Sequence, residues 1–299
     1  MGIKLTPSTL LMLVMPPLLW AGNAVVGRAV HEMVPPITLN FLRWAIAFVV
    51  LFPFGCSIFR KGSGLWRNWR RLAWLGLLGI GLYNALQYLA LQSSTPINVT
   101  LVAASMPVWM LIVGWLFFGA SVSYRQAIGA AASIAGVLLI LSRGQWHLLL
   151  ALHFVIGDIF MIIATIAFAF YSWLLTSSED PEALSRNWAT FLLAQLTFGV
   201  AWSGAFAAGE WALTDWRIFW SWPLVAALLF VAIGPAIIAF RCWGAGVQRA
   251  GPTMAGFFSN LTPLFAALMS SAFIGEMPHL YHLWAFALIA GGIVYSSRH

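Results

Sequence analysis

The chain has 299 residues, of which 62% are hydrophobic and only 8% are charged. Soluble domains carry charge on about a quarter of their residues, so this chain has too few charges to cover a surface that faces water. The composition excludes a soluble domain and predicts an integral membrane protein. The net charge of +7 does not indicate nucleic-acid binding, because five of the basic residues gather in one polar segment, 60–71, instead of alternating with aromatic residues.

Ten apolar runs are long enough to cross a bilayer, which takes roughly 20 residues each. They cover about residues 7–30, 36–55, 70–92, 96–118, 124–142, 154–176, 187–208, 218–248, 253–274 and 279–297. The first run continues past Trp20 without a small-residue cleavage pattern, so we expect a retained span and not a signal peptide. The eighth run is long enough to be tilted or broken. The predicted fold class is an all-α integral membrane protein with ten transmembrane helices.

The basic residues predict the orientation of these spans. With the N-terminus in the cytoplasm, ten Lys and Arg residues fall in cytoplasmic segments, and three, Arg28, Arg143 and Arg217, fall on the other side. Cytoplasmic loops are enriched in Lys and Arg, so this orientation is favoured. An even number of spans returns the C-terminus to the cytoplasm. We therefore expect a multi-pass protein with both termini cytoplasmic.

Two segments of the chain share the same spacing of Gln and Pro residues. Residues 92–107 read QSSTPINVTLVAASMP and residues 248–263 read QRAGPTMAGFFSNLTP. A shift of 156 positions carries Gln92, Pro96 and Pro107 onto Gln248, Pro252 and Pro263. The period holds five spans, and an odd number makes the second copy cross the membrane in the opposite direction. We predict two inverted five-helix repeats, 1–148 and 149–299, in one membrane domain.

Four residues inside the runs are candidate hinges: Gly79, Pro107, Pro235 and Pro263. Pro107 and Pro263 sit deep in their runs, where proline removes a backbone hydrogen bond and bends the helix axis. Gly79 aligns with Pro235 at the same shift of 156. Prolines are common in transmembrane helices for other reasons, but their recurrence in pairs favours a hinge or a cavity-shaping role.

Polar and aromatic residues within the runs are the candidate substrate-binding residues. Polar groups in hydrocarbon need partners or water and so tend to face the interior of a helix bundle. The candidates are Trp20, Asn23, Tyr83, Gln87, Tyr88, Trp109, Tyr171, Arg241, Trp243, Ser259 and Asn260. Taken singly, each polar residue also fits an interhelical hydrogen bond, and each aromatic residue fits an anchor at the lipid interface. Together they predict a central pocket for a flat, partly apolar solute.

Two arginines, Arg43 and Arg241, lie well away from the ends of their predicted spans. Arg241 is well inside the eighth run, and an arginine at that depth costs about 3 kcal/mol on insertion scales. It either pairs with an anionic group such as a substrate carboxylate, or it reaches the membrane surface or the carbonyls of a helix. Arg43, in the second run, is interpreted as structural.

The sequence offers little catalytic chemistry. His153 and Asp158 have an HxxxxD spacing found in some acyltransferases, but two residues at a span entrance are a weak match. There is no GxxxxGK[ST] motif, and Cys56 and Cys242 have no metal-ligand spacing. We expect no catalytic residue, no metal and no cofactor; an intramembrane enzyme such as an acyltransferase remains the alternative. Because Asp158 is the only acidic residue inside a predicted span, we expect weak or no obligatory proton coupling.

Small residues line one side of the fifth and tenth runs. They are Gly129, Ser133 and Gly136 in the fifth, and Ala287, Gly291 and Gly292 in the tenth. Small residues let transmembrane helices approach closely. The contact lies either within one subunit or between two, so the oligomeric state stays open.

Three segments resemble a known family. They are LLWAGNAVVGRAV at 18–30, PPITLNFLRWAIAF at 35–48 and FIGEMPHLYHLWAFALIAGGIVY at 273–295. Together with the repeated block, they resemble the ten-helix EamA-type members of the drug/metabolite transporter superfamily over nearly the whole chain. The family pattern has a glutamate after the fourth and ninth spans. Glu276 supplies the second glutamate, and Ala120 stands at the position of the first.

The resemblance implies a secondary transporter or facilitator in a bacterial inner membrane. Such a protein exports amino acids, aromatic or apolar ones foremost, and related metabolites by alternating access through a central pocket. Aromatic residues would contact the side chain of the substrate, and Asn, Gln and Arg would hold its head group. The implied partners are a small-molecule substrate and membrane lipid, without nucleic acid. A scaffold or receptor without transport is the remaining alternative.

Overall fold

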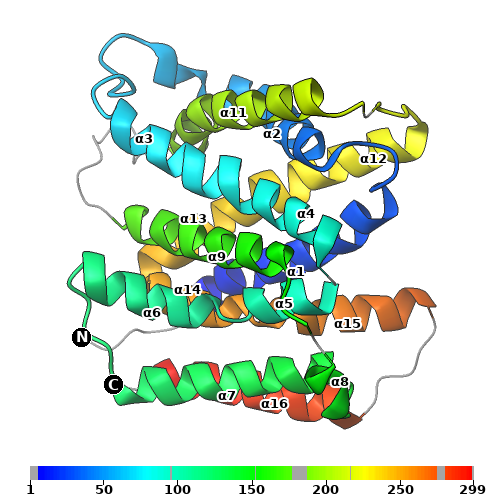
Figure 1. Cartoon of the computed structure of the whole chain (residues 1–299). Helices are drawn as coiled ribbons and strands as arrows, with labels where there is room; N and C mark the ends of the chain where they lie inside the picture. The colour runs from blue at the N-terminus through cyan, green and yellow to red at the C-terminus, as the bar shows by residue number, and fades with distance from the viewer. Residues whose placement is uncertain are drawn as a thin grey trace.

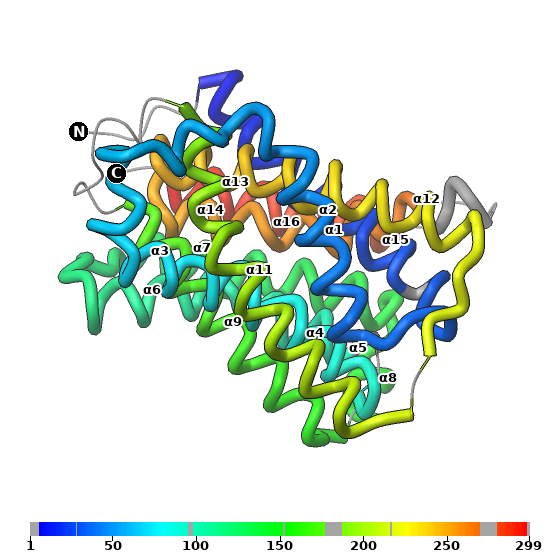
Figure 2. The backbone as a smooth tube through the Cα atoms, turned by 90° about the horizontal axis from the view of Figure 1, so that it is seen from above, coloured from blue at the N-terminus to red at the C-terminus, as the bar shows by residue number. Residues whose placement is uncertain are grey.

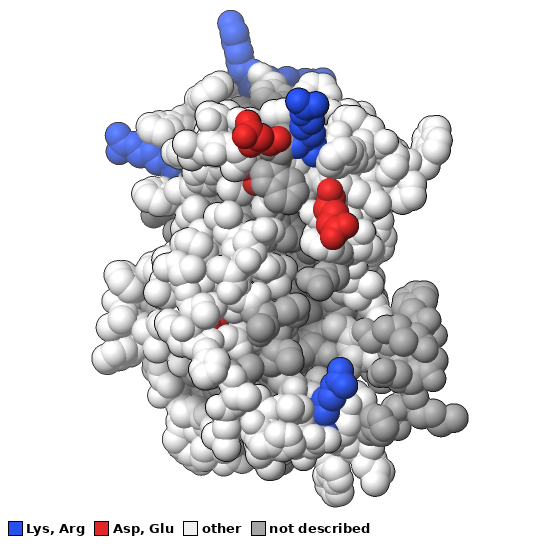
Figure 3. All heavy atoms as spheres, turned by 45° about the vertical axis from the view of Figure 1, so that its right-hand side comes forward, with Lys and Arg blue, Asp and Glu red and all other residues white. Residues whose placement is uncertain are grey.

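The computed structural model describes residues 6–94, 96–151, 153–176, 187–215, 217–274 and 280–297. In these ranges all regular secondary structure is helical, and nine helices are long and apolar enough to cross a membrane. These helices lie roughly along one common direction in a single bundle, and both termini are at the same end of it (Figures 1 and 2). Few charged side chains lie on the face shown in Figure 3, as lipid contact requires. The predicted all-α membrane fold is confirmed.

The helices fall in the order expected from the ten apolar runs. In the first half they are α1 (Pro7–Ala29), α2 (Pro36–Gly55), α3 (Trp69–Leu75), η2 (Gly76–Leu82), α4 (Tyr83–Ser93), α5 (Pro96–Ala103), α6 (Met106–Phe117) and α7 (Tyr124–Leu141). In the second half they are α9 (Ile156–Leu174), α11 (Trp188–Leu213), α12 (Trp222–Val231), η3 (Ala232–Ile238), α13 (Ala239–Ala250), α14 (Pro252–Ser259), α15 (Leu261–Ile274) and α16 (Leu280–Ser297). Two short helices, η1 (Cys56–Phe59) and α8 (His147–Leu150), lie in connections.

The same irregularities occur in both halves of the chain. The third and eighth spans each contain a π-helix of seven residues, η2 and η3, and a shift of 156 positions carries one onto the other. The same shift carries α7 onto α16. The fourth span breaks between α5 and α6, and the ninth breaks between α14 and α15. A π-helix inside a span often marks a functional site.

The breaks in the fourth and ninth spans change the environment expected for two prolines. Pro107 lies in the first turn of α6, and Pro263 in the first turn of α15, instead of deep inside a helix. A proline in the first turn loses no intrahelical hydrogen bond, so it marks where the second segment begins. Gly79 and Pro235 lie within η2 and η3.

The seventh span ends later than expected. Helix α11 continues to Leu213 and so includes Glu210, which is buried. The Glu210 carboxylate accepts hydrogen bonds from the backbone N–H groups of Ile37 and Thr38, over 3.0 and 2.7 Å, and from Thr38 Oγ1 over 2.7 Å. A carboxylate at a helix N-terminus is favoured by the helix dipole. Glu210 therefore ties the end of α11 to the start of α2.

Helices α7 and α16 lie side by side within one subunit (Figure 1), and glycines of both helices lie at their contact. A Cβ atom added to Gly129 would lie 2.6 Å from the carbonyl oxygen of Gly292, and one added to Gly136 would lie 2.8 Å from that of Ala285. These backbones approach as closely as glycine allows. Gly291 has open space instead, with nothing within 4 Å of an added Cβ.

Candidate binding site

A cavity of about 110 Å³ lies at the centre of the bundle. Seven of the predicted residues line it: Trp20, Asn23, Tyr83, Gln87, Ser259, Asn260 and the hinge candidate Pro263. The lining also includes Asn84, Thr100 and Phe240. The walls come from α1, α4 and α5 of the first half and from α13, α14 and α15 of the second, so both halves of the chain build the cavity.

The cavity opens toward the end of the bundle opposite to the termini. A second hollow of about 300 Å³, here called the vestibule, shares Asn23, Gln87 and Thr100 with the cavity and continues to Tyr88 and His31. His31 lies in the connection between α1 and α2, which is at the end away from both termini (Figure 1). Tyr88, a predicted binding residue, therefore lines the mouth of the cavity.

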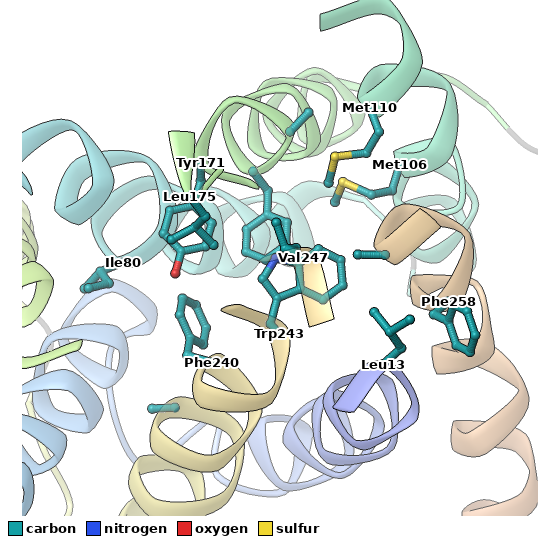
Figure 4. Close-up of a cluster of buried hydrophobic side chains, with 14 of the residues drawn as sticks. Leu13, Ile80, Met106, Met110, Tyr171, Leu175, Phe240, Trp243, Val247 and Phe258 are labelled. Carbon is teal, nitrogen blue, oxygen red and sulfur yellow. The ribbon is translucent and has the colours of Figure 1, made fainter. Parts of the chain in front are cut away.

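Aromatic rings close the cavity on the side of the termini. This aromatic cluster consists of Trp20, Tyr83, Phe168, Tyr171, Phe240 and Trp243. The centroid of the Trp20 ring lies 5.6 Å from that of Phe168 and 5.2 Å from that of Trp243. Figure 4 shows Tyr171 of α9 together with Phe240 and Trp243 of α13. Phe168, Tyr171 and Trp243 are buried, so these rings form a packed layer on this side of the cavity.

The polar ends of the cluster find partners inside the protein. Trp243 Nε1 donates to Ser172 Oγ over 3.1 Å, and the Tyr171 hydroxyl donates to Gln195 Oε1 over 3.1 Å. Buried Trp and Tyr side chains normally need such partners. Gly79 makes room for the cluster, since a Cβ there would lie 2.5 Å from the Tyr171 ring. Tyr171 and Trp243, predicted to line the pocket, instead form its closed side.

Arg43 lies directly behind the cavity wall. Its side chain is fully buried, and Nη1 donates to Asn84 Oδ1 over 3.1 Å and, over 3.4 Å each, to Asn23 Oδ1 and the Tyr88 hydroxyl. Two of these partners, Asn23 and Asn84, line the cavity. The sequence interpretation of Arg43 as merely structural did not place it next to the site.

Two predicted binding residues lie elsewhere and line neither the cavity nor the vestibule. Trp109 Nε1 donates to Ser105 Oγ over 2.9 Å within its own span. Arg241 is partly exposed, and its guanidinium lies 5.4 Å from the centroid of the Trp188 ring at the start of α11. Helical periodicity could have indicated two missed residues: Phe168 and Phe240 stand three positions before Tyr171 and Trp243, and therefore on the same helix faces.

The HxxxxD pair has a different environment from the cavity. Asp158 is buried, and its carboxylate accepts hydrogen bonds from Ser94 Oγ, from Asn98 Nδ2 over 3.1 Å and from the backbone N–H of Val155 over 2.9 Å. His153 is exposed and offers its carbonyl oxygen to Asn98. Asp158 thus holds the start of α9 against α4 and α5. Glu276, from the family pattern, lies outside the described residues.

Membrane-spanning helices around a central hollow are the architecture expected of a membrane transporter. The chain matches the EamA-like transporter family over residues 7–142 and 155–298, and it belongs to that family. This confirms the family predicted from the sequence.

Several relatives are named as transporters. The chain is 25% identical over 281 residues to the aromatic amino acid exporter YddG of Ancylobacter novellus, covering 92% of each protein. It is 26% identical over 286 residues to an uncharacterized transporter of Archaeoglobus fulgidus, covering 91% of each. It is 23% identical over 288 residues to the uncharacterized inner membrane transporter YedA of Escherichia coli, covering 93% of this chain and 86% of YedA. One crystal structure superposes with a TM-score of 0.73 at 22% identity, covering 96% of both chains, which shows the fold alone.

Proposed function

We propose that this protein is a secondary transporter or facilitator that exports amino acids, aromatic or apolar ones foremost, and related small metabolites. The observation that carries the proposal is the central cavity, which has aromatic and amide walls, opens through the vestibule and is closed by the aromatic cluster. Such walls suit a solute with a flat apolar part and a polar head. The name of the YddG relative supports aromatic amino acids as substrates.

Transport proceeds by alternating access between two inverted repeats, 1–148 and 149–299. The matched π-helices η2 and η3 and the matched breaks of the fourth and ninth spans support this division, as do the two segments of the family match. The halves rock about these points, so that the vestibule closes while the aromatic cluster opens. Because both facing states must accept and release the substrate, the site must bind it comparably in each.

Both termini lie in the cytoplasm of a bacterial cell, as the distribution of Lys and Arg favours. The vestibule then faces outward. The name of the YedA relative supports an inner membrane. Within the site, Trp20, Tyr83 and Phe240 contact the side chain of the substrate. The polar residues Asn23, Gln87, Ser259 and Asn260 bind its head group.

Flux in liposomes tests the proposal. The purified full-length protein should release preloaded labelled Phe or Trp faster than protein-free liposomes do. Tyr83→Ala removes a ring from the cavity wall and should lower this rate at least about tenfold, since aromatic burial contributes more than 1.4 kcal/mol. Tyr295→Ala is the matched control, because Tyr295 is exposed on α16.

Absence of flux for every amino acid tested would refute the transport proposal. Turnover of an acyl substrate that is lost in Asp158→Asn would favour the intramembrane enzyme instead. Binding of an amino acid without flux or turnover would favour a receptor.

A further inference from the structure

Arg43 carries a buried positive charge that no described carboxylate neutralises. The two buried carboxylates of the described chain, Asp158 and Glu210, are bonded to other groups. The one ion pair found in the described ranges joins His31 to Glu32. A buried charge is normally paired, because removing it from water without a counter-ion is costly. The field of this guanidinium therefore favours an anion nearby.

The hydrogen bonds of the guanidinium are also incomplete. Nη1 makes all three, and the two at 3.4 Å are longer than typical N–H···O bonds. Nε and Nη2 are buried, and neither has a partner within the described part of the chain. The site thus holds more donors than acceptors.

Arg43 fixes the orientation of two amide groups in the cavity wall. A guanidinium can only donate, so Asn23 and Asn84 must turn their Oδ1 atoms toward it. The Nδ2 groups are then left on the other side of each amide, and among the described residues they make no hydrogen bond. Both residues line the cavity. The wall therefore offers free N–H donors backed by a positive charge.

We propose that Asn23, Asn84 and Arg43 form a subsite for the carboxylate group of the substrate. The amide N–H groups contact the carboxylate oxygens, while Arg43 is a positioning residue that orients both amides and supplies the compensating charge. The aromatic rings of Trp20 and Tyr83 line the same cavity and receive the rest of the molecule. This inference rests on the proposed function, because the subsite belongs to the same cavity.

Head-group variants of one aromatic compound test the subsite on the wild-type protein. Calorimetric binding is measured for L-phenylalanine, for 3-phenylpropionate, which lacks the amine, and for 2-phenylethylamine, which lacks the carboxylate. We expect 2-phenylethylamine to bind at least about tenfold more weakly than 3-phenylpropionate, the effect of one charge-assisted hydrogen bond. Equal affinity for 2-phenylethylamine and 3-phenylpropionate overturns the subsite. So does a failure of both L-phenylalanine and 3-phenylpropionate to bind.

A single isosteric variant tests the subsite without removing the buried Arg43 side chain. Arg43→Met risks a folding failure, because it removes a buried side chain. Asn84→Asp keeps the size of the side chain and places a carboxylate against Nη1, so it neutralises the guanidinium without opening a cavity. We expect the preference for 3-phenylpropionate over 2-phenylethylamine to fall at least about tenfold. Asn84→Asp also replaces an amide N–H of the cavity wall by a carboxylate, so a carboxylate preference that survives this variant overturns the proposal.

Arg241→Met is the matched control, because Arg241 also lies within a membrane span but lines neither the cavity nor the vestibule. We expect it to leave the carboxylate preference unchanged; loss of the preference in this variant overturns the assignment to Arg43.

Flux measured in parallel separates the proposed carboxylate subsite from the proposed transport function. Carboxylate-selective binding without flux supports the subsite and refutes transport. Flux without carboxylate preference supports transport and refutes the subsite.

Discussion

The indole Nε1 of Trp20 donates a hydrogen bond to the carbonyl oxygen of Pro235 over 3.3 Å. Trp20 lines the cavity and Pro235 lies in η3, so this bond joins the binding site to an irregular helix. The other π-helix has a counterpart, since Asn40 Nδ2 donates to the carbonyl oxygen of Ile80 in η2 over 3.1 Å. π-Helices disturb the regular backbone ladder. In both of them, therefore, a side chain of a neighbouring span binds the backbone.

Trp20→Phe should slow transport without changing head-group preference. The substitution keeps a ring in the cavity wall and removes the donor to Pro235. A neutral hydrogen bond contributes about 1 kcal/mol, so we expect the rate of Phe efflux from liposomes to fall about fivefold. Trp109→Phe is the control, because among the described residues the indole of Trp109 bonds only to Ser105, in its own span. Equal rates in the two variants would show that the bond to Pro235 has no part in the transport cycle.

Two adjacent glycines of α16 should respond in opposite ways to alanine. A Cβ on Gly292 would lie 2.6 Å from the carbonyl oxygen of Gly129 in α7 and force the helices apart. We expect Gly292→Ala to lower the free energy of unfolding by about 1–3 kcal/mol, as overpacking does. Gly291→Ala meets open space and should be neutral or slightly stabilising. Thermal unfolding in detergent measures both, and similar melting temperatures would contradict the close contact of α7 with α16.

The sequence predicted the spans well because their apolar length and the positions of Pro and Gly are local properties. The site depends on contacts between spans, which one sequence does not display. Arg43 and Arg241 look alike as intramembrane arginines, yet the partners of Arg43 stand 20 and 41 positions away in α1 and α4. Pro107 looked like a kink because the break before it, at Ser105, carries no distinct signal. The aromatic cluster was partly foreseen, since Tyr171 and Trp243 lie within it.

Cysteine labelling should place equivalent points of the two halves on opposite sides of the membrane. Trp66 and Trp222 are related by the shift of 156 positions, and both are exposed. Trp66→Cys should react with a membrane-impermeant maleimide only from the cytoplasmic side, and Trp222→Cys only from outside, each in a Cys56→Ser background. Labelling of both from the same side would rule out inverted repeats. If Trp66→Cys instead reacts only from outside and Trp222→Cys only from the cytoplasmic side, the inverted repeats still hold and the proposed orientation is reversed.

A proton gradient alone should not drive accumulation of the substrate. A carrier coupled to protons needs a titratable group that the substrate and the proton share. In the described chain no carboxylate lines the cavity or the vestibule, while Asp158 and Glu210 are bonded to helix starts and polar side chains. In liposomes with an imposed pH gradient and no other ion gradient, labelled Phe should therefore equilibrate to equal concentrations inside and outside. Uphill accumulation would contradict uncoupled transport. His31 lines the vestibule, so His31→Asn shows whether any such coupling runs through this side chain.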